Sequence, residues 1–241
     1  MRVVAMLPTY NEAGAIRACI EQILALPIDA GVVVADDQSP DGTGQIADEL
    51  AAEHPGRVFV IHRTGPRGRG VAGIEGFKRC VQLPVDYVVE MDADLQHNPA
   101  DIPRLVAAAD RTGAEIVVGS RYVRGGGEVN RGAERRLVSR LANSYLRLTL
   151  GLSLRDCSSG YRLFRREALE ALDLDTMSAS GPWILQEVLW RAKQRNYRIV
   201  EIPIQFLERT AGESKLNLRI LLRSLITPFV LRRSTPLGGR A

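Results

Sequence analysis

Short apolar runs alternate with longer amphipathic segments along the first 120 residues. The runs are rich in β-branched residues and lack strict alternation, which is typical of strands covered on both faces; they are Val3–Leu7, Val32–Ala35, Val58–Ile61, Tyr87–Met91 and Ile116–Val118. The segments between them carry apolar residues near a period of about 3.6 and are predicted to be helices: Glu12–Leu26, Thr43–Glu53, Val71–Gln82 and Pro99–Arg111. Strands that alternate with helices of this length predict βαβ units and a mostly parallel sheet.

A different pattern begins after Tyr122. A glycine-rich loop is followed by an arginine-rich helix, a turn, a further helix and a strand, predicted over residues 125–127, Ala133–Leu150, Asp156–Gly160, Trp183–Arg195 and Ile199–Ile202. We therefore expect one α/β domain with a mostly parallel, Rossmann-like sheet flanked by helices. The C-terminal segment is expected to form an amphipathic helix with an apolar stripe, and residues 234–241 are expected to fray; the stripe consists of Leu216, Ile220, Leu221, Leu225 and Ile226.

The positive charge of the chain is concentrated at its C-terminal end. The net charge is +4, yet residues 209–241 carry seven basic side chains against Glu213 alone, or +6, which leaves −2 for the first 208 residues. A basic end on a slightly acidic body indicates an anionic partner, such as a phosphate, a membrane surface or a nucleic acid. Nucleic acid is disfavoured, because aromatic residues make up only 5% of the chain and form no stacking platform.

The three cysteines are an odd number without the spacing of metal ligands, which favours a reducing compartment and no disulfide framework. The N-terminal apolar run is too short for a signal peptide. No stretch reaches the roughly 18–20 apolar residues of a membrane span, since Arg223 and Pro228 interrupt the longest one, from Ile220 to Leu231. We therefore expect a chain that does not span a bilayer.

Polar segments follow four of the predicted strands, at the sheet edge where parallel sheets bind ligands: Pro8–Glu12, Asp36–Thr43, Arg63–Arg69 and Met91–Gln96. The last segment contains Asp92 and Asp94, whose carboxylates can share a hard divalent cation, and Gln96, which offers a carbonyl oxygen. Mg²⁺ and Mn²⁺ prefer oxygen ligands and bridge to substrate phosphates. The alternative is that Asp94 or Asn98 merely caps the helix expected at Pro99.

Asp36 and Asp37 directly follow an apolar strand, where paired like charges need a partner. Hydrogen bonding to a ribose or a nucleobase gives Asp37 such a role. Asp41 and Thr43 are expected to serve the turn and the helix start.

The segment Gly68–Gly73 matches the G-x-G-x-x-G pattern of dinucleotide-binding folds, and Asp92 follows about 20 residues later. In those folds the glycine loop leaves its strand directly, whereas residues 63–67 intervene here. A nicotinamide or flavin enzyme is therefore the less favoured interpretation.

Arginine is frequent between residues 121 and 140, and in the predicted helix Arg135, Ser139 and Asn143 share one face at i, i+4 and i+8. Arginine binds phosphate in a bidentate manner, and a neighbouring hydroxyl can add a hydrogen bond. Arg136 and Arg140 are interpreted as a solvated charged face.

Taken together, these motifs resemble the inverting family 2 glycosyltransferases of GT-A fold, and among them the polyprenol- and dolichol-phosphate mannosyltransferases. The resemblance spans about residues 3–216, and the order of the motifs along the chain makes it specific. Beyond the segments already named, it rests on Gly119–Tyr122, Ser159–Arg162, Ile202–Ile204, Phe206, Arg209 and Gly212–Leu216.

The resemblance implies roles for individual residues. The nucleotide would be held by Pro8, Tyr10, Glu12, Asp37 and Asp92, and the metal, Mg²⁺ or Mn²⁺, by Asp92, Asp94 and Gln96. Donor or acceptor phosphates would be held by Arg121, Arg135, Ser139, Arg209 and Lys215, and the catalytic set would be Asp94, Arg121, Arg135 and Arg209. Asp156 and Glu187 are left between sugar contacts, capping and surface exposure.

The same resemblance divides the chain into a GT-A domain over residues 1–210, a loop and amphipathic, membrane-associated helix over 211–233, and the tail. The nucleotide-binding half would cover about residues 1–120 and the acceptor half about 121–210. Gly212–Leu216 would belong to a mobile loop that closes over the donor. Two segments depart from the family pattern, since Gly68–Gly73 carries a charge and lacks an aromatic residue, and Ser178–Trp183 is poor in aromatic residues.

The function implied is transfer of a hexosyl group, mannose from GDP-mannose in first place, onto a polyprenyl monophosphate with inversion. A phosphate monoester has a second pKa of about 6 and needs no general base at pH 7, so the main task is to neutralise two anionic groups. A cytoplasmic enzyme, peripheral at the membrane face, is expected, with room for a membrane-anchoring partner protein. The alternatives are a hexosyltransferase that uses a UDP-sugar, an NAD-dependent oxidoreductase and a non-catalytic nucleotide-binding module.

Overall fold

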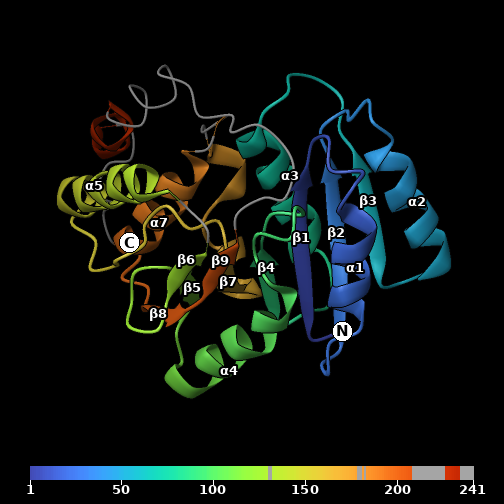
Figure 1. Ribbon diagram of the computed structural model, residues 1–241, viewed down its shortest axis with the longest axis horizontal. Coiled ribbons are helices and arrows are strands. Elements are labelled where there is room, and N and C mark those ends of the chain that lie inside the picture. Colours follow the sequence, from blue (N-terminus) through green and yellow to red (C-terminus); the bar gives the residue numbers. More distant parts are fainter. Residues whose placement is uncertain (130–131, 178–180, 182, 208–225, 234–241) are drawn as a thin grey trace.

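The computed structural model describes residues 1–129, 132–177, 181, 183–207 and 226–233, with the side chain of Arg135 also outside the described part. A seven-stranded sheet in the order β3-β2-β1-β4-β7-β5-β8 forms its centre (Figure 1). Its strands are β1 (Val3–Thr9), β2 (Ala30–Asp36), β3 (Val58–His62), β4 (Tyr87–Glu90), β5 (Ile116–Ser120), β7 (Arg162–Arg165) and β8 (Ile199–Pro203). Only β7 runs antiparallel to its neighbours β4 and β5, so the predicted α/β fold with a mostly parallel sheet is confirmed.

Helices cover both faces of this sheet, as Figure 1 shows. On one face, α1 (Ile16–Leu24), α2 (Thr43–Glu53) and α4 (Ile102–Thr112) bury their apolar residues in one core cluster. On the other face, α3 (Arg69–Val81), α5 (Ala133–Leu150), α6 (Arg166–Glu170) and α7 (Ile184–Gln194) contribute to a second cluster. Two short 3-10 helices, η1 (Pro99–Asp101) and η2 (Leu174–Thr176), complete the connections.

The central strand β1 explains why both faces need a cover. Val3, Ala5 and Leu7 belong to the cluster under α1, whereas Val4 and Met6 belong to the cluster under α3. Apolar side chains that alternate between two covered faces give the continuous apolar run seen in the sequence. On the α3 side, a Cβ at Gly76 would lie 2.7 Å from Cγ of Met6, so glycine at this position permits the close approach of α3 to β1.

The structure contains elements that were not predicted, among them the short helices α6 and η2. The strand β7 was not predicted, because its four residues begin and end with arginine and look polar. Arg162 is nevertheless fully buried, since its guanidinium donates to the carbonyls of Leu185 at 2.7 Å and Cys157 at 3.0 Å. The helix predicted from Glu12 begins only at Ile16, and a two-stranded parallel sheet of β6 (Gly127–Val129) and β9 (Gln205–Leu207) was also not predicted.

The C-terminal segment is described only as a helix over residues 226–233. Leu231 packs into the core cluster under α5 and α7, while Ile226, Phe229 and Val230 are exposed. Most of the predicted apolar stripe, from Leu216 to Leu225, lies outside the described residues, as does the loop Gly212–Leu216. None of the described helices is long and apolar enough to cross a membrane. The three cysteines are buried and free.

Candidate functional site

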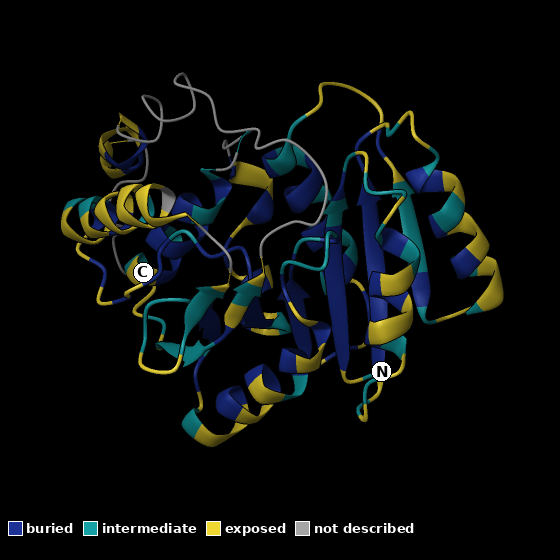
Figure 2. Cartoon of the chain, in the orientation of Figure 1, coloured by how far each residue is buried: buried dark blue, intermediate teal, exposed yellow. Residues whose placement is uncertain are grey.

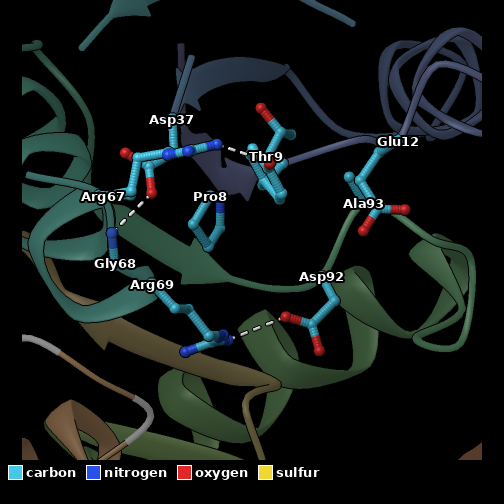
Figure 3. A pocket seen from close by; sticks show the side chains of 11 residues that line it. Pro8, Thr9, Glu12, Asp37, Arg67, Gly68, Arg69, Asp92 and Ala93 are labelled. Carbon is cyan, nitrogen blue, oxygen red and sulfur yellow. Dashed lines mark hydrogen bonds and ion pairs between the residues drawn. The ribbon is translucent and has the colours of Figure 1, made fainter. Parts of the chain in front are cut away.

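The carboxyl ends of β1, β2 and β4 and the start of α3 line a cavity of about 460 Å³ (Figure 3). Its wall contains all five residues for which nucleotide binding was predicted, Pro8, Tyr10, Glu12, Asp37 and Asp92. The remaining lining residues are Thr9, Arg67, Gly68, Arg69, Ala72 and Ala93. The fold thus brings the predicted strand-end residues together, and adds three residues of the glycine segment and Arg67 that the sequence analysis had not assigned to the nucleotide.

Asp37 is fixed by the connection between β3 and α3. Its Oδ1 accepts a hydrogen bond from Arg63, which is buried. Its Oδ2 accepts one from the backbone N–H of Gly68 at 2.7 Å (Figure 3). Gly68 precedes the first residue of α3. The first glycine of the G-x-G-x-x-G segment therefore donates to a carboxylate of the chain itself, which a dinucleotide-binding loop would direct at a pyrophosphate.

The neighbouring aspartates serve the local backbone. Asp36 accepts hydrogen bonds from the hydroxyls of Thr9 at 3.1 Å and Ser39 at 2.6 Å. Asp41 accepts from the backbone N–H of Thr43 at 3.1 Å and from its hydroxyl at 2.6 Å, which confirms its predicted role in the turn and helix start. At the mouth of the cavity, Arg67 lies over the ring of Tyr10, 5.1 Å from its centroid, and donates to the Tyr10 hydroxyl at 2.6 Å.

Arg69 joins two acidic side chains of the β4 end. Its guanidinium lies 2.9 Å from Oδ1 of Asp92 (Figure 3). The same guanidinium lies 3.2 Å from Oε1 of the buried Glu90. Burial raises the pKa of Glu90, while Arg69 lowers it in part. A Cβ at Gly160 would lie 2.9 Å from Nη2 of Arg69, so the glycine leaves room for this side chain. Arg69 is the charged residue by which Gly68–Gly73 departs from the family pattern. It therefore balances two carboxylates at the edge of the cavity.

The residues after Asp92 form a tight turn. Oδ1 of Asp94 accepts a hydrogen bond from the backbone N–H of Gln96 at 3.0 Å, and the Gln96 amide donates to the Leu207 carbonyl at 3.0 Å. Nδ1 of the buried His97 accepts from the N–H of Asp92 at 3.1 Å. Burial lowers the pKa of His97, although Asp92 and Asp94 act in the opposite direction. His97 thus fixes the Asp92 backbone, a role that was not predicted, although His97 directly follows the Met91–Gln96 segment. Asn98 caps η1, as one of the alternatives proposed.

Asp92 and Asp94 offer only carboxylate oxygens, and both are partly exposed. Within the described part of the chain, no three or more His, Cys, Asp and Glu side chains gather into a metal-binding group. Two carboxylates fit Mg²⁺ or Mn²⁺, because these ions take further oxygens from substrate phosphates and water. Asp92 is shared with Arg69, so a cation that binds Asp92 through Oδ1 has to compete with this arginine.

Asp156 and Arg121 form a second, buried charge pair at the end of β5. Nε and Nη2 of Arg121 lie 2.7 Å and 2.8 Å from the two carboxylate oxygens of Asp156, and Nη2 also donates to Ser158 at 2.7 Å. Nη1 lies 3.4 Å from Glu128. Burial alone would raise the pKa of Asp156, but the hydrogen bonds and charge of Arg121 lower it. Surface exposure is thereby excluded for Asp156, and likewise for Glu187, which is buried and pairs with Arg191 at 2.7 Å.

The predicted polar face of α5 lies against this pair. The Tyr122 hydroxyl donates to Oγ of Ser139 at 2.8 Å, and the Asn143 amide donates to Oγ of Ser158 at 2.9 Å. Ser139 is thus brought next to the Arg121 strand end, as predicted. The side chain of Arg135, and all of Arg209 and Lys215, lie outside the described residues, so their phosphate-binding roles stay predictions.

We predict that Asp156→Asn lowers the free energy of unfolding by about 3 kcal/mol at pH 7, because it removes the carboxylate that binds Nε and Nη2 of Arg121, whose side chain is 9% exposed. Glu128, at 3.4 Å from Nη1, is the remaining described carboxylate beside this guanidinium. Since the pKa of Asp156 is lowered by folding, its contribution is present above the unfolded pKa of about 3.9 and is lost as the pH falls through the folded value. Urea unfolding at pH 7 measures the loss of stability in the variant, and urea unfolding at pH 3 measures how far the contribution of Asp156 has been lost in the acid. Asp175→Asn, at an exposed ion pair, is the control. A loss below about 1 kcal/mol, the level of a surface pair, would contradict the assignment.

Comparison with known proteins places the chain among sugar-transferring enzymes. The family described as Glycosyl transferase family 2 matches residues 5–173. Polyprenol monophosphomannose synthase of Mycolicibacterium smegmatis is 40% identical over 216 residues, which cover 90% of this chain and 81% of that protein. Undecaprenyl-phosphate mannosyltransferase of Micrococcus luteus is 43% identical over 217 residues, covering 90% and 88%.

Solved structures agree on the fold. Glucosyl-3-phosphoglycerate synthase from Mycobacterium tuberculosis, in complex with Mn²⁺, UDP and glucosyl-3-phosphoglycerate, superposes with a TM-score of 0.67 at 23% identity, covering 98% of this chain and 81% of that one. A mannosyltransferase from Pyrobaculum calidifontis, in complex with GDP-Man and Mn²⁺, gives 0.64 at 20% identity, covering 100% and 65%. The sequence relatives argue against the NAD-dependent alternative, and the chain belongs to glycosyl transferase family 2, as a glycosyltransferase.

Proposed function

We propose that the chain transfers a mannosyl group from GDP-mannose to a polyprenyl monophosphate, with inversion at the anomeric carbon. Two relatives at 40% and 43% identity, a polyprenol monophosphomannose synthase and an undecaprenyl-phosphate mannosyltransferase, support this pair of substrates. The observation that carries the proposal is the single cavity that gathers Pro8, Tyr10, Glu12, Asp37 and Asp92 beside Asp94. Arg121, which is paired with Asp156, follows β5 at the same edge of the sheet.

The nucleotide would lie against Pro8 and the stacked Tyr10 and Arg67. Each carboxylate oxygen can accept more than one hydrogen bond, so Asp37 keeps acceptor capacity after its bonds to Arg63 and Gly68. Because these two bonds fix its orientation, Asp37 can accept from a ribose hydroxyl or a base amine without reorganisation. Glu12 would add a second carboxylate at the same end of the cavity.

Asp92 and Asp94 would hold Mg²⁺ or Mn²⁺. The bound cation would supply positive charge to the leaving diphosphate. The side chains of this site do the positioning: His97 fixes the Asp92 backbone, Arg69 holds the Asp92 carboxylate, and the turn to Gln96 holds Asp94. The role of Gln96 as a metal ligand stays a prediction, and its amide N–H₂ is directed at β9.

The acceptor phosphate is its own nucleophile, so the site has to bind it and needs no base. Arg135, Ser139, Arg209 and Lys215 are proposed to bind it, with Ser139 already beside Tyr122. Nε and Nη2 of Arg121 are engaged by Asp156 and Ser158, so a phosphate contact by Arg121 would have to use Nη1, which also lies 3.4 Å from Glu128. With these contacts, Arg121 fixes the carboxyl end of β5, which faces α5.

The reaction is proposed to take place at the cytoplasmic face of a membrane. The outer side of α5 exposes Leu137, Leu141 and Leu148, whose exposed fractions are 60%, 61% and 82% (Figure 2). Exposed apolar side chains beside arginines are typical of helices that lie in the membrane interface. The helix over 226–233 adds Phe229 and Val230. A membrane-anchoring partner protein is the alternative occupant of this face.

We predict that Asp94→Ala lowers the rate of mannosyl transfer about 100-fold or more, because the leaving diphosphate loses its electrostatic partner. The assay compares GDP-mannose with UDP-glucose as donor to polyprenyl phosphate, with and without EDTA. Asp86→Ala, at the exposed opposite end of β4, is the matched control and should stay fully active. Full activity of Asp94→Ala, or activity undiminished by EDTA, would refute the metal site. A preference for UDP-glucose would show that GDP-mannose is not the donor.

Arg135→Lys tests the acceptor site, because lysine keeps the charge and loses the planar fork that binds phosphate in a bidentate manner. We expect the KM for the lipid phosphate to rise about tenfold, while GDP affinity changes little. Arg136→Lys, one residue further along α5, is the control. If GDP affinity falls while the lipid KM holds, Arg135 belongs to the donor diphosphate; if neither changes, it is a solvated charge.

A further inference from the structure

A second hollow lies between α5 and the loop that follows β5. Its volume is about 680 Å³, and five arginines but no acidic residue line it: Arg121, Arg124, Arg140, Arg147 and Arg155. The other lining residues are Tyr122, Val123, Gly125, Gly126, Asn143 and Ser144. We call this hollow the arginine groove. Arg155 precedes β7 and Arg124 follows β5, so the groove opens at the same edge of the sheet as the nucleotide cavity.

Four of these arginines form no salt bridge with a described side chain, although Glu201 accepts a hydrogen bond from the backbone N–H of Arg155 at 2.8 Å. Arg121 is neutralised by Asp156, but no described side chain forms a salt bridge with the guanidinium groups of Arg124, Arg140, Arg147 or Arg155. Cζ of Arg140 lies 6.0 Å from the centroid of the Tyr122 ring. Several like charges around one hollow attract an anion, and guanidinium groups bind phosphate oxygens in pairs.

The orientation of α5 identifies the source of that anion. With about 100° per residue, Leu137, Leu141 and Leu148 lie within about 40° of each other on the helix. Arg140 and Arg147 lie about 60° and 80° around the helix axis from Leu137, the nearest of these leucines, on the side of the groove. All five side chains are exposed. When an interfacial helix buries its apolar stripe at the acyl boundary, the basic side chains beside the stripe lie at the level of the lipid phosphates.

We propose that the arginine groove binds the phosphate headgroup of an anionic phospholipid, next to the place where the polyprenyl phosphate acceptor enters. This inference rests on the proposed membrane location of the enzyme and names the lipid class that the surface recognises. The interpretation of Arg140 as a merely solvated charge is replaced by a role in this groove. Arg121 is excluded from the groove's binding set because its donors serve Asp156.

The test compares two triple variants of equal charge change. The groove variant carries Arg140→Gln, Arg147→Gln and Arg155→Gln. The control carries Arg111→Gln, Arg195→Gln and Arg198→Gln, three exposed arginines that precede β5 and β8 at the opposite edge of the sheet. Thermal unfolding establishes that both variants fold. Co-sedimentation then measures binding of the full chain to phosphatidylcholine vesicles with and without phosphatidylglycerol, at one fixed salt concentration.

We expect the natural chain and the control variant to prefer the anionic vesicles by about tenfold or more, and the groove variant to lose this preference. Equal preference in the groove variant, or no preference in the natural chain, overturns the proposal. Mannosyl transfer to a polyprenyl phosphate in neutral detergent is measured in parallel. The groove variant should keep its kcat and lipid KM there, since no bilayer headgroup takes part. A raised lipid KM in neutral detergent would instead assign the groove to the acceptor phosphate.

Vesicle binding and transfer fail independently. If the natural chain prefers anionic vesicles and transfers no sugar to any lipid phosphate, the result supports lipid binding by the groove and contradicts the proposed reaction. If it transfers mannose in detergent and shows no preference for anionic vesicles, the result supports the proposed reaction and contradicts lipid binding by the groove.

Discussion

Pairing of arginine with carboxylate at the carboxyl edge of the sheet is the interaction on which this site depends. Asp37, Asp92 and Asp156 come from the ends of different segments, and each is held by an arginine from elsewhere: Arg63, Arg69 and Arg121. The parallel strands bring acidic residues to one edge of the sheet, where their negative charges would otherwise repel one another. Two of these pairs fix the carboxylates of Asp37 and Asp92 at the wall of the nucleotide cavity, and the third fixes Arg121 at the wall of the arginine groove.

The same pairing prepares the site for anionic substrates. Both the donor diphosphate and the lipid phosphate carry negative charge, so an edge of uncompensated carboxylates would repel them. With Arg63, Arg69 and Arg121 in place, the acidic residues keep their oxygens as ligands and acceptors without a strongly negative field. The apolar stripe of α5 and the arginine groove extend this arrangement outward, from the nucleotide cavity to the surface at which a lipid-linked phosphate is proposed to arrive.

The residues on one side of each pair could be predicted from the sequence, and their partners could not. Strand ends are visible as apolar runs that stop before Pro8, Asp36 or Asp92, and a parallel sheet places such ends together. The arginines reach them across 23 to 35 residues of sequence, and no local pattern encodes those contacts. For the same reason Asp156 was left unassigned, although it is the buried partner of Arg121. The strand β7 escaped prediction because a four-residue segment flanked by arginines lacks an apolar period, and its burial depends on carbonyls that only the folded chain supplies.

The central claim is that the acceptor is a phosphate that attacks without help from a base, in a site built for charge balance. The most direct measurement offers the enzyme GDP-mannose, Mg²⁺ or Mn²⁺, and either a polyprenyl monophosphate or the polyprenol of equal length. Mass spectrometry identifies the products, and NMR assigns the anomeric configuration of the transferred mannose. The account predicts a mannosyl phosphate linkage of inverted anomeric configuration from the phosphate and no product from the alcohol. Mannosyl transfer to the alcohol, whose hydroxyl requires a general base, would contradict it.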